Sequence, residues 1–254
     1  MLSCRPLEKI GFVNGFSTRL GGVSPFPEND LNLAGFDDDL PANINENRRR
    51  FLDLFNDEYI LATVWQVHGN DVRLVTSKKE AAEGTVKADA IVSDLSNALA
   101  AVKTADCVPI LYGDRKLRIF AAAHAGWRGT VLGIASKTVD TMKKMFASKP
   151  SDIVCAIGPA AGRNRYEVGP EVVRSLKQHY PAGGKYFSPT HDGHALIDLH
   201  SANRDQLIKA GVDRESIFIA PFCTIERNDL FFSYRAEKEK YGKVGRLLSV
   251  IGRA

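Results

Sequence analysis

Short apolar runs separated by polar turns follow one another through the first half of the chain. Runs of this length, rich in Val, Ile and Phe, are typical of β-strands. Strands are therefore predicted over residues 12–18, 59–67, 72–75, 88–93, 99–103, 108–112 and 117–124. Several of these runs are apolar throughout, which indicates sheets that are covered on both faces.

The spacing of apolar residues becomes helical after residue 130. Apolar residues from Val131 to Phe146 recur at intervals of three or four, with lysines and Asp140 on the opposite face. This pattern predicts an amphipathic helix that starts at residue 130. Proline and glycine positions predict further helices over residues 170–179 and 201–210. Further strands are predicted over residues 153–157, 217–222 and 247–251.

The two patterns together predict an α+β fold, in which two mixed β-sheets pack in layers and helices flank them. The chain has 254 residues, a length that one α/β or α+β domain can fill. It contains no internal repeat, low-complexity tract or long linker that would mark a boundary. We therefore expect residues 1–254 to form a single catalytic domain.

The composition is that of an ordinary globular protein. Apolar residues make up 44% of the chain and charged residues 25%, which argues against disorder. No apolar run reaches the roughly eighteen residues that a transmembrane helix needs, and the first residues lack the apolar stretch of a secretory signal. A cytoplasmic protein with no membrane partner is expected. The four cysteines are far apart and include no Cys-x-x-Cys pair, so reduced thiols are expected.

The charge pattern bears on possible partners. The formal net charge is +4, and the lysines and arginines are spread along the whole chain. This spread argues against nucleic acid as a partner, because nucleic-acid-binding proteins gather their positive charge on one face. At most the small excess favours an anionic substrate, and ordinary solvation of the surface explains it equally well.

Three residues that can bind a metal stand near the ends of predicted strands. His68 follows one apolar run, His124 ends another, and Cys107 lies in the segment that joins two more. Side chains at strand ends project into crevices where a sheet fixes their position and a loop leaves them accessible. Two imidazoles and a thiolate suit zinc, with a fourth position open for water or substrate. On spacing alone the interpretation is weak, because a histidine at a strand end is more often simply hydrogen-bonded.

The segment after His124 offers a second element of chemistry. Residues 125–130 contain Gly126, Arg128 and Gly129 and run into the predicted helix. A helix N-terminus with free backbone N–H groups and an adjacent arginine binds phosphate well. A simple turn into the helix with an exposed arginine accounts for the glycines as well.

Taken together, seven motifs in this order resemble a known family. They are GFSTRLGGVS at 15–24, QVHG at 66–69, ADA at 88–90, ADCVP at 105–109, HAGWRG at 124–129, YEV at 166–168 and FSYR at 232–235. The series is similar to the multicopper polyphenol oxidase (laccase)-type family, now regarded as purine nucleoside phosphorylases and also described as peptidoglycan editing factors. The resemblance covers nearly the whole chain.

The resemblance implies a zinc site at His68, Cys107 and His124, with Cu²⁺ as a metal also reported for the family. It implies phosphorolysis of adenosine, inosine and methylthioadenosine, and hydrolytic deamination of adenosine, so the expected partners are purine nucleosides and inorganic phosphate. It also implies a layered α+β fold shared with certain cysteine-dependent toxin deamidases. Arg19 and Asp89 join the expected pocket because they are charged residues inside matched motifs. The protein is expected to be a monomer or a homodimer.

Both implied reactions assign roles to these residues. In deamination, zinc would lower the pKa of a bound water, and Asp89 or Asp106 would move protons. In phosphorolysis, Arg19, Arg128 and the glycines Gly126 and Gly129 would hold the phosphate that attacks the ribose. What the metal contributes to that second reaction does not follow from the residues.

The chain departs from the family in two places. Relatives often carry cysteines after the segment Ile-Gly-Pro at 157–159, where this chain has AAGRNR at 160–165. A second cysteine is also common after Cys223-Thr224, where this chain has Ile225-Glu226. Any metal or redox role of those thiols is therefore not expected here.

Other activities use the same residues differently. A true multicopper oxidase needs a blue-copper centre and a separate histidine-rich cluster, for which six histidines are too few. A metal-free amidase would use Cys107 as the nucleophile and His124 as its base, which fits the cytoplasmic peptidoglycan-precursor editing proposed for bacterial relatives. A binding module without turnover is the third alternative.

Overall fold

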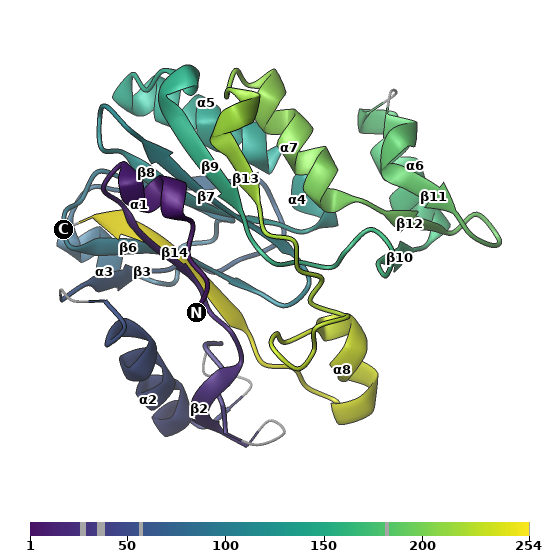
Figure 1. Cartoon of the computed structure of the whole chain (residues 1–254), viewed down its shortest axis with the longest axis horizontal. Helices are drawn as coiled ribbons and strands as arrows, with labels where there is room; N and C mark the ends of the chain where they lie inside the picture. Colours follow the sequence, from purple (N-terminus) through teal and green to yellow (C-terminus); the bar gives the residue numbers. More distant parts are fainter. Residues whose placement is uncertain (26–28, 35–38, 56–57, 181–182, 254) are drawn as a thin grey trace.

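The computed structural model describes residues 1–25, 29–34, 39–55, 58–180 and 183–253 (Figure 1). Two large mixed sheets form its centre, which confirms the predicted α+β architecture. One sheet has four strands in the order β1, β14, β6 and β3, with β3 parallel to β6 and the other pairs antiparallel. These strands are β1 Val13–Phe16, β14 Leu247–Arg253, β6 Ala98–Thr104 and β3 Ile60–Ala62.

The second sheet has six strands in the order β13, β9, β7, β8, β5 and β4. Its two outer pairs, β13 with β9 and β4 with β5, are parallel, and the inner pairs are antiparallel. These strands are β13 Ile217–Ile219, β9 Ile153–Ile157, β7 Val108–Asp114, β8 Phe120–Ala125, β5 Ala90–Ser93 and β4 Val72–Val75. Strands β7 and β8 are buried along their whole length, as their continuous apolar runs predict.

The two sheets pack against each other and helices cover their outer faces. Phe120 and Leu111 of the larger sheet share one core with Val102 and Ile251 of the smaller sheet. The outer face of the larger sheet carries α5 Ile134–Phe146 and α7 Leu199–Lys209, and α6 Pro170–His179 adds Val172, Val173 and Leu176 to the same core. The outer face of the smaller sheet is covered by α2 Pro41–Leu52, through Phe51. Layers of helix, sheet, sheet and helix result (Figure 1).

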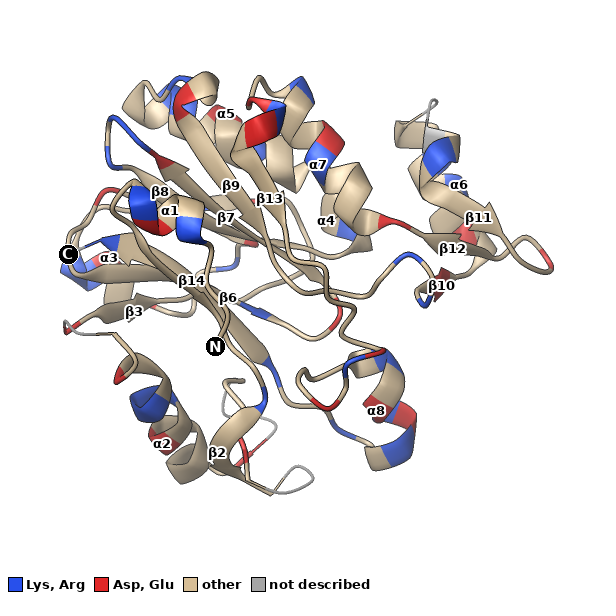
Figure 2. Cartoon of the chain, in the orientation of Figure 1, with Lys and Arg blue, Asp and Glu red and all other residues tan. Residues whose placement is uncertain are grey.

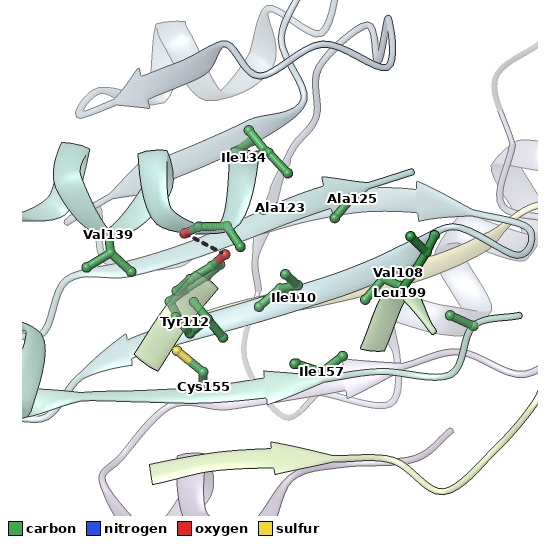
Figure 3. Packing of buried hydrophobic residues seen from close by; sticks show 14 of the residues in the cluster. Val108, Ile110, Tyr112, Ala123, Ala125, Ile134, Val139, Cys155, Ile157 and Leu199 are labelled. Carbon is green, nitrogen blue, oxygen red and sulfur yellow. Dashed lines mark hydrogen bonds between the residues drawn. The ribbon is translucent and has the colours of Figure 1, made fainter. Parts of the chain in front are cut away.

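The core beneath α5 shows how the apolar strands hold this helix. Ile110 and Tyr112 of β7 pack with Ile134 and Val139 of α5 (Figure 3). Tyr112 is fully buried, and its hydroxyl donates to the carbonyl of Ala135 at 3.3 Å. The one polar atom that this side chain brings into the core is therefore satisfied.

The remaining elements are short. The helices are α1 Arg5–Lys9, α3 Lys78–Ala82, α4 Trp127–Val131 and α8 Tyr234–Tyr241. A three-stranded antiparallel sheet consists of β10 Glu167–Val168, β12 Ala195–Ile197 and β11 Phe187–Pro189, and β2 Leu20–Ser24 lies near the N-terminus. Three 3-10 helices complete the described chain, at Pro150–Asp152, Gly183–Tyr186 and Arg214–Ser216.

The structure corrects two predicted elements near the candidate site. The helix predicted from residue 130 is two helices, α4 and α5, because Gly133 has a φ of +76° that breaks the helix between them. The strand predicted over residues 59–67 ends after three residues as β3. Beyond it, Trp65 makes a single bridge to Lys87, and no ladder continues.

The surface carries both signs of charge on most elements. Figure 2 shows basic and acidic residues together on α2, α7 and α8. On α2, Glu46 accepts from Arg49 and Arg50 at 2.9 Å and 2.8 Å. In the part of the chain that the structure describes, no helix is both long and apolar enough to cross a membrane.

Candidate metal centre

His124 lies near the end of β8, where the sheet holds it rigidly. Its ring is almost fully buried, and its backbone N–H donates to the carbonyl of Asp89 at 2.7 Å. The side chain of Asp89 makes a second contact with His124, because its Oδ1 lies 2.8 Å from His124 Nδ1. This contact fixes the orientation of the ring and leaves Nε2 as the nitrogen available to a metal.

The same carboxylate holds the loop that carries His68. The backbone N–H groups of Val67, His68 and Gly69 donate to Asp89 at 3.2 Å, 2.9 Å and 2.7 Å. His68 has a φ of +59°, which is uncommon for a residue with a side chain. Three hydrogen bonds to one buried carboxylate offset the cost of this conformation. Asp89 therefore positions two of the three predicted ligands.

Cys107 lies in the tight turn between β6 and β7. Asp106, the residue before it, has a φ of +80° and a buried carboxylate. That carboxylate accepts from the Thr224 hydroxyl at 2.6 Å and from the backbone N–H of Arg235 at 2.7 Å. Burial raises the pKa of Asp106, although these hydrogen bonds oppose the shift. Asp106 thus ties the turn to two distant segments, one of which is α8.

The three predicted ligands converge. One ligand atom from each of His68, Cys107 and His124 lies within 4.8 Å of the other two. The two imidazole rings are 4.8 Å apart between centroids and nearly perpendicular, at 85°. Among the described residues this is the only group of His, Cys, Asp or Glu close enough to hold a metal ion.

Gly126 lets the chain pass close to this group. A Cβ atom at this position would lie 3.0 Å from Cys107 Sγ and 3.2 Å from His68 Cδ2. Both separations are shorter than ordinary contacts, so a side chain here would press on two of the three ligands. The glycine preserves the space that a metal ion and its fourth ligand would need.

The charges of the site favour a thiolate. Burial alone would raise the pKa of Cys107, but the charge and hydrogen bonds of His124, and then those of His68, lower it to about 6. For His124, burial lowers the pKa while the Cys107 charge and the Asp89 hydrogen bond raise it to about 9. Burial would also raise the pKa of Asp89, and its hydrogen bonds with His124 and Gly69 lower it. A thiolate and an oriented imidazole are the forms that bind metal ions.

The donor set fits zinc. Two imidazole nitrogens and one thiolate match the ligands of catalytic zinc sites, which keep a fourth position open. Cys107 is only partly buried and His68 is exposed, so a small molecule can reach the group from one side. The carboxylate behind His124 is the partner that metal-bound histidines usually have.

The glycine-containing segment after His124 differs from the expected phosphate loop. It forms the five-residue helix α4, with Gly126 as its N-cap. Gly129 lies inside this helix, where a Cβ would come within 3.0 Å of the Gly69 carbonyl oxygen. Arg128 is exposed, and its guanidinium lies 4.3 Å from the ring centroid of Trp127. Gly129 thus allows α4 to pack closely on the loop that contains His68 and Gly69, while Arg128 remains accessible.

Arg19 is placed differently from the expectation that it binds phosphate. Its side chain is buried and pairs with Asp30 at 2.7 Å and Glu237 at 3.0 Å. Its guanidinium also lies 4.6 Å from the Phe232 ring centroid. A phosphate would have to displace two carboxylates to reach it, so the placement gives Arg19 a structural role that joins the N-terminal segment to α8.

Two further residues beside the site were not selected from the sequence. Tyr166 is partly buried. Burial and the Cys107 charge raise the pKa of its hydroxyl, and the charges of Arg235 and Arg128 oppose that rise. Arg235 lies over the Tyr166 ring, at 5.3 Å from its centroid. Both residues stand inside the motifs YEV and FSYR, so the motifs were a signal that they matter.

The other histidines lie elsewhere. His191 and His194 stack on each other in the turn between β11 and β12, with ring centroids 4.7 Å apart. His179 is exposed at the end of α6, and His200 Nε2 lies 3.2 Å from the Gly158 carbonyl oxygen. None of these four histidines belongs to the group of three converging ligands.

Comparison with known proteins identifies the family. The family described as multi-copper polyphenol oxidoreductase laccase matches residues 13–254. Purine nucleoside phosphorylase YfiH of Shigella flexneri is 38% identical over 246 residues, which are 97% of this chain and 95% of that protein.

Solved structures agree with this match. The crystal structure of YlmD from Geobacillus stearothermophilus has a TM-score of 0.88 and 36% identity, and covers 96% of this chain and 92% of its own. The Bacillus licheniformis hypothetical protein YfiH has a TM-score of 0.88 and 31% identity, with 98% and 94% covered. The chain therefore belongs to the multi-copper polyphenol oxidoreductase laccase family.

Proposed function

We propose that this protein is a zinc-dependent purine nucleoside phosphorylase that acts on adenosine, inosine and methylthioadenosine and also deaminates adenosine. The observation that carries the proposal is the convergence of His68, Cys107 and His124 within 4.8 Å, with Asp89 behind His124. The names of the relatives, among them purine nucleoside phosphorylase YfiH, support the substrate class.

Zinc is the proposed metal, and the three converging residues would hold it. When bound, such an ion lowers the pKa of water and withdraws electrons from a ligand atom of the substrate. Copper also accepts imidazole and thiolate ligands. The described part of the chain offers one metal-binding group only, whereas a multicopper oxidase needs a second cluster, so polyphenol oxidation is disfavoured.

The remaining residues would bind and orient the substrate. Asp89 accepts four hydrogen bonds and is fully buried, so it is better suited to positioning the ligands than to moving protons. Burial and the nearby Cys107 charge raise the pKa of Tyr166, so its hydroxyl stays protonated and can donate to a substrate oxygen. Arg128 is exposed on α4, which begins next to Gly126, and can hold an anion.

Metal analysis and a product assay on the same preparations test the proposal. We expect about one zinc per chain in the wild type and little in Cys107→Ala, because a site with two remaining ligands binds zinc weakly. Cys223→Ser is the matched control, since Cys223 is also partly exposed, accepts from the Gly162 N–H and is not one of the three converging residues. Its zinc content should stay at the wild-type level.

Adenosine is then incubated with and without inorganic phosphate. Adenine and ribose 1-phosphate should form only when phosphate is present, whereas inosine should form in both cases. The Cys107→Ala variant should lose both products. Unchanged adenosine, inosine and methylthioadenosine in every reaction of the zinc-loaded wild type would refute the substrate assignment.

A metal-free amidase is the second candidate, and one observation favours it. Cys107 with a lowered pKa, His124 beside it and Asp89 behind His124 form the nucleophile, base and orienting group of a thiol hydrolase. Such an enzyme could remove a wrongly incorporated amino acid from a cytoplasmic peptidoglycan precursor. Chelation separates the two candidates: a zinc enzyme loses activity and regains it on zinc addition, whereas a thiol amidase ignores the chelator and is inactivated by alkylation.

A further inference from the structure

Two arginines lie on segments that pack near Cys107. Arg128 lies on α4, two residues after Gly126, where a Cβ would lie 3.0 Å from Cys107 Sγ. Arg235 lies in the first turn of α8, and its backbone N–H donates to the carboxylate of Asp106 at 2.7 Å. Because Asp106 immediately precedes Cys107, this hydrogen bond holds the start of α8 beside the turn that carries the thiol.

Tyr166 is the point at which these groups meet. The Arg235 guanidinium lies 5.3 Å from the Tyr166 ring centroid, and its Nη1 donates to the Glu167 carbonyl at 2.8 Å. Burial and the Cys107 charge raise the pKa of Tyr166, and the charges of Arg235 and Arg128 oppose that shift. The Arg235 guanidinium therefore lies over the Tyr166 ring, and α4 carries Arg128 two residues after the glycine that lies against Cys107.

The two arginines differ from others nearby in their ion pairing. Arg165 pairs with Glu226 at 2.9 Å, and Arg227 pairs with Asp229 at 2.8 Å. No ion pair to a carboxylate is found within the described ranges for Arg128 or Arg235, and both side chains are exposed. The charge of Arg235 also acts on the carboxylates of Glu167 and Asp106, but neither forms an ion pair with it. A guanidinium with no carboxylate in direct contact is suited to binding a phosphate through two parallel hydrogen bonds.

We infer that Arg128 and Arg235 form the phosphate-binding face of the site, with the Tyr166 hydroxyl as a third donor. The inference rests on the proposed phosphorylase function and assigns the anion to Arg235 in place of the buried Arg19. A nucleoside carries no charge, so the substrate that uses both guanidinium groups is the phosphate.

The chemistry requires these residues to bind, not to exchange protons. An oxygen of hydrogen phosphate forms a bond to C1′ of the ribose while the bond from C1′ to the purine nitrogen breaks. The electron pair of that bond leaves with the purine, and the proton that hydrogen phosphate carried ends on the purine. Two guanidinium groups orient the anion toward C1′ and keep its charge in place.

The test compares the variants Arg128→Gln and Arg235→Gln with Arg214→Gln. Arg214 is also exposed, and it precedes β13, which runs parallel to β9, so it lies at the end of the sheet where β9 begins. Cys107 lies beyond the other end of β9, because Ala161, after that strand, donates to Asp106. Zinc content and melting temperature are measured for each variant to show that it is folded and loaded.

We expect the KM for phosphate to rise roughly tenfold or more in Arg128→Gln and in Arg235→Gln, because a hydrogen-bonded charge is lost. The KM for the nucleoside should rise much less than the KM for phosphate, because the nucleoside carries no charge. Arg235→Lys should recover part of the loss, since it keeps the charge without the fork. An unchanged KM for phosphate in both glutamine variants would overturn the inference and leave the proposed function intact.

Direct binding separates this inference from the proposed function. Inorganic phosphate is titrated into zinc-loaded protein and followed by ³¹P NMR, with no nucleoside present. Weaker binding in Arg128→Gln and Arg235→Gln than in Arg214→Gln supports the phosphate face even when no nucleoside is turned over. Binding that is absent, or equal in all variants, overturns it.

Discussion

Replacing Asp89 with asparagine tests whether one carboxylate organises the metal site. The side chain accepts four hydrogen bonds: Oδ1 from His124 Nδ1 and the His68 N–H, and Oδ2 from the N–H groups of Val67 and Gly69. Asparagine has nearly the same shape but only one acceptor oxygen. Its amide nitrogen must therefore face two donors, whichever way the group is turned.

Each orientation has a separate cost. With the amide nitrogen toward the loop, Val67 and Gly69 each lose an acceptor, at about 1–3 kcal/mol for each donor. The loop is partly exposed, and water replaces part of what is lost, so we expect about 2–3 kcal/mol in total. With the amide nitrogen toward His124, Nδ1 must accept, and the ring proton moves to Nε2, the nitrogen that a metal requires.

Zinc affinity and thermal unfolding of Asp89→Asn report on these two costs. We expect affinity to fall about 10- to 100-fold, as for other losses of a carboxylate behind a metal-bound histidine. The melting temperature of the metal-free protein should fall by roughly 4–10 °C. Asp71→Asn is the control, since the Asp71 side chain forms an exposed ion pair with Lys137 at 3.2 Å and the substitution leaves its backbone hydrogen bonds to Asp89 and Ala90 in place. Wild-type zinc affinity in Asp89→Asn would refute the reasoning.

Three further predictions follow from the same contacts. Gly126→Ala should lower zinc content and activity with little loss of stability, because its φ of −68° suits alanine while the new Cβ presses on the ligands; metal analysis and thermal unfolding check this. In chelated protein, alkylation of Cys107 should rise with pH through a midpoint near 6, where the thiol loses its proton, and an ordinary midpoint near 8.5 would contradict it. Arg19→Met should lower the free energy of unfolding by about 3–5 kcal/mol in denaturant titration, because Asp30 and Glu237 lose their buried partner. Unchanged stability of Arg19→Met, together with a raised KM for phosphate, would contradict the structural role and indicate that Arg19 binds phosphate.

Much of the sheet architecture follows from local sequence, and the smaller elements do not. Strands β7 and β8 were predicted because a run buried on both faces is apolar at every position. Helices α2 and α8 escaped prediction because they are mostly polar. The buried residues of α2 are Ile44, Asn47 and Phe51, and that of α8 is Glu237, so neither helix shows a continuous apolar stripe. The strands of the three-stranded sheet have only two or three residues, too few for an alternating pattern.

The convergence of the three ligands depends on pairings between distant segments. His124 reaches the site because β8 pairs with β7 in a register that places it opposite Pro109, two residues after Cys107. No periodicity within either strand specifies that register. Family motifs supplied the group of three residues, and the fold shows why they meet.

The segment before His68 shows most clearly how a functional site departs from local rules. Its apolar run predicts a strand, and a strand would satisfy its backbone N–H groups by pairing with a neighbour. The described structure instead turns three consecutive N–H groups, from Val67 to Gly69, onto the Asp89 carboxylate. The same carboxylate orients His124, so one side chain replaces a strand partner and aligns two ligands at once. The predicted strand forms only at Ile60–Ala62, and its missing end marks the place where hydrogen bonds to a carboxylate replace backbone pairing to build the site.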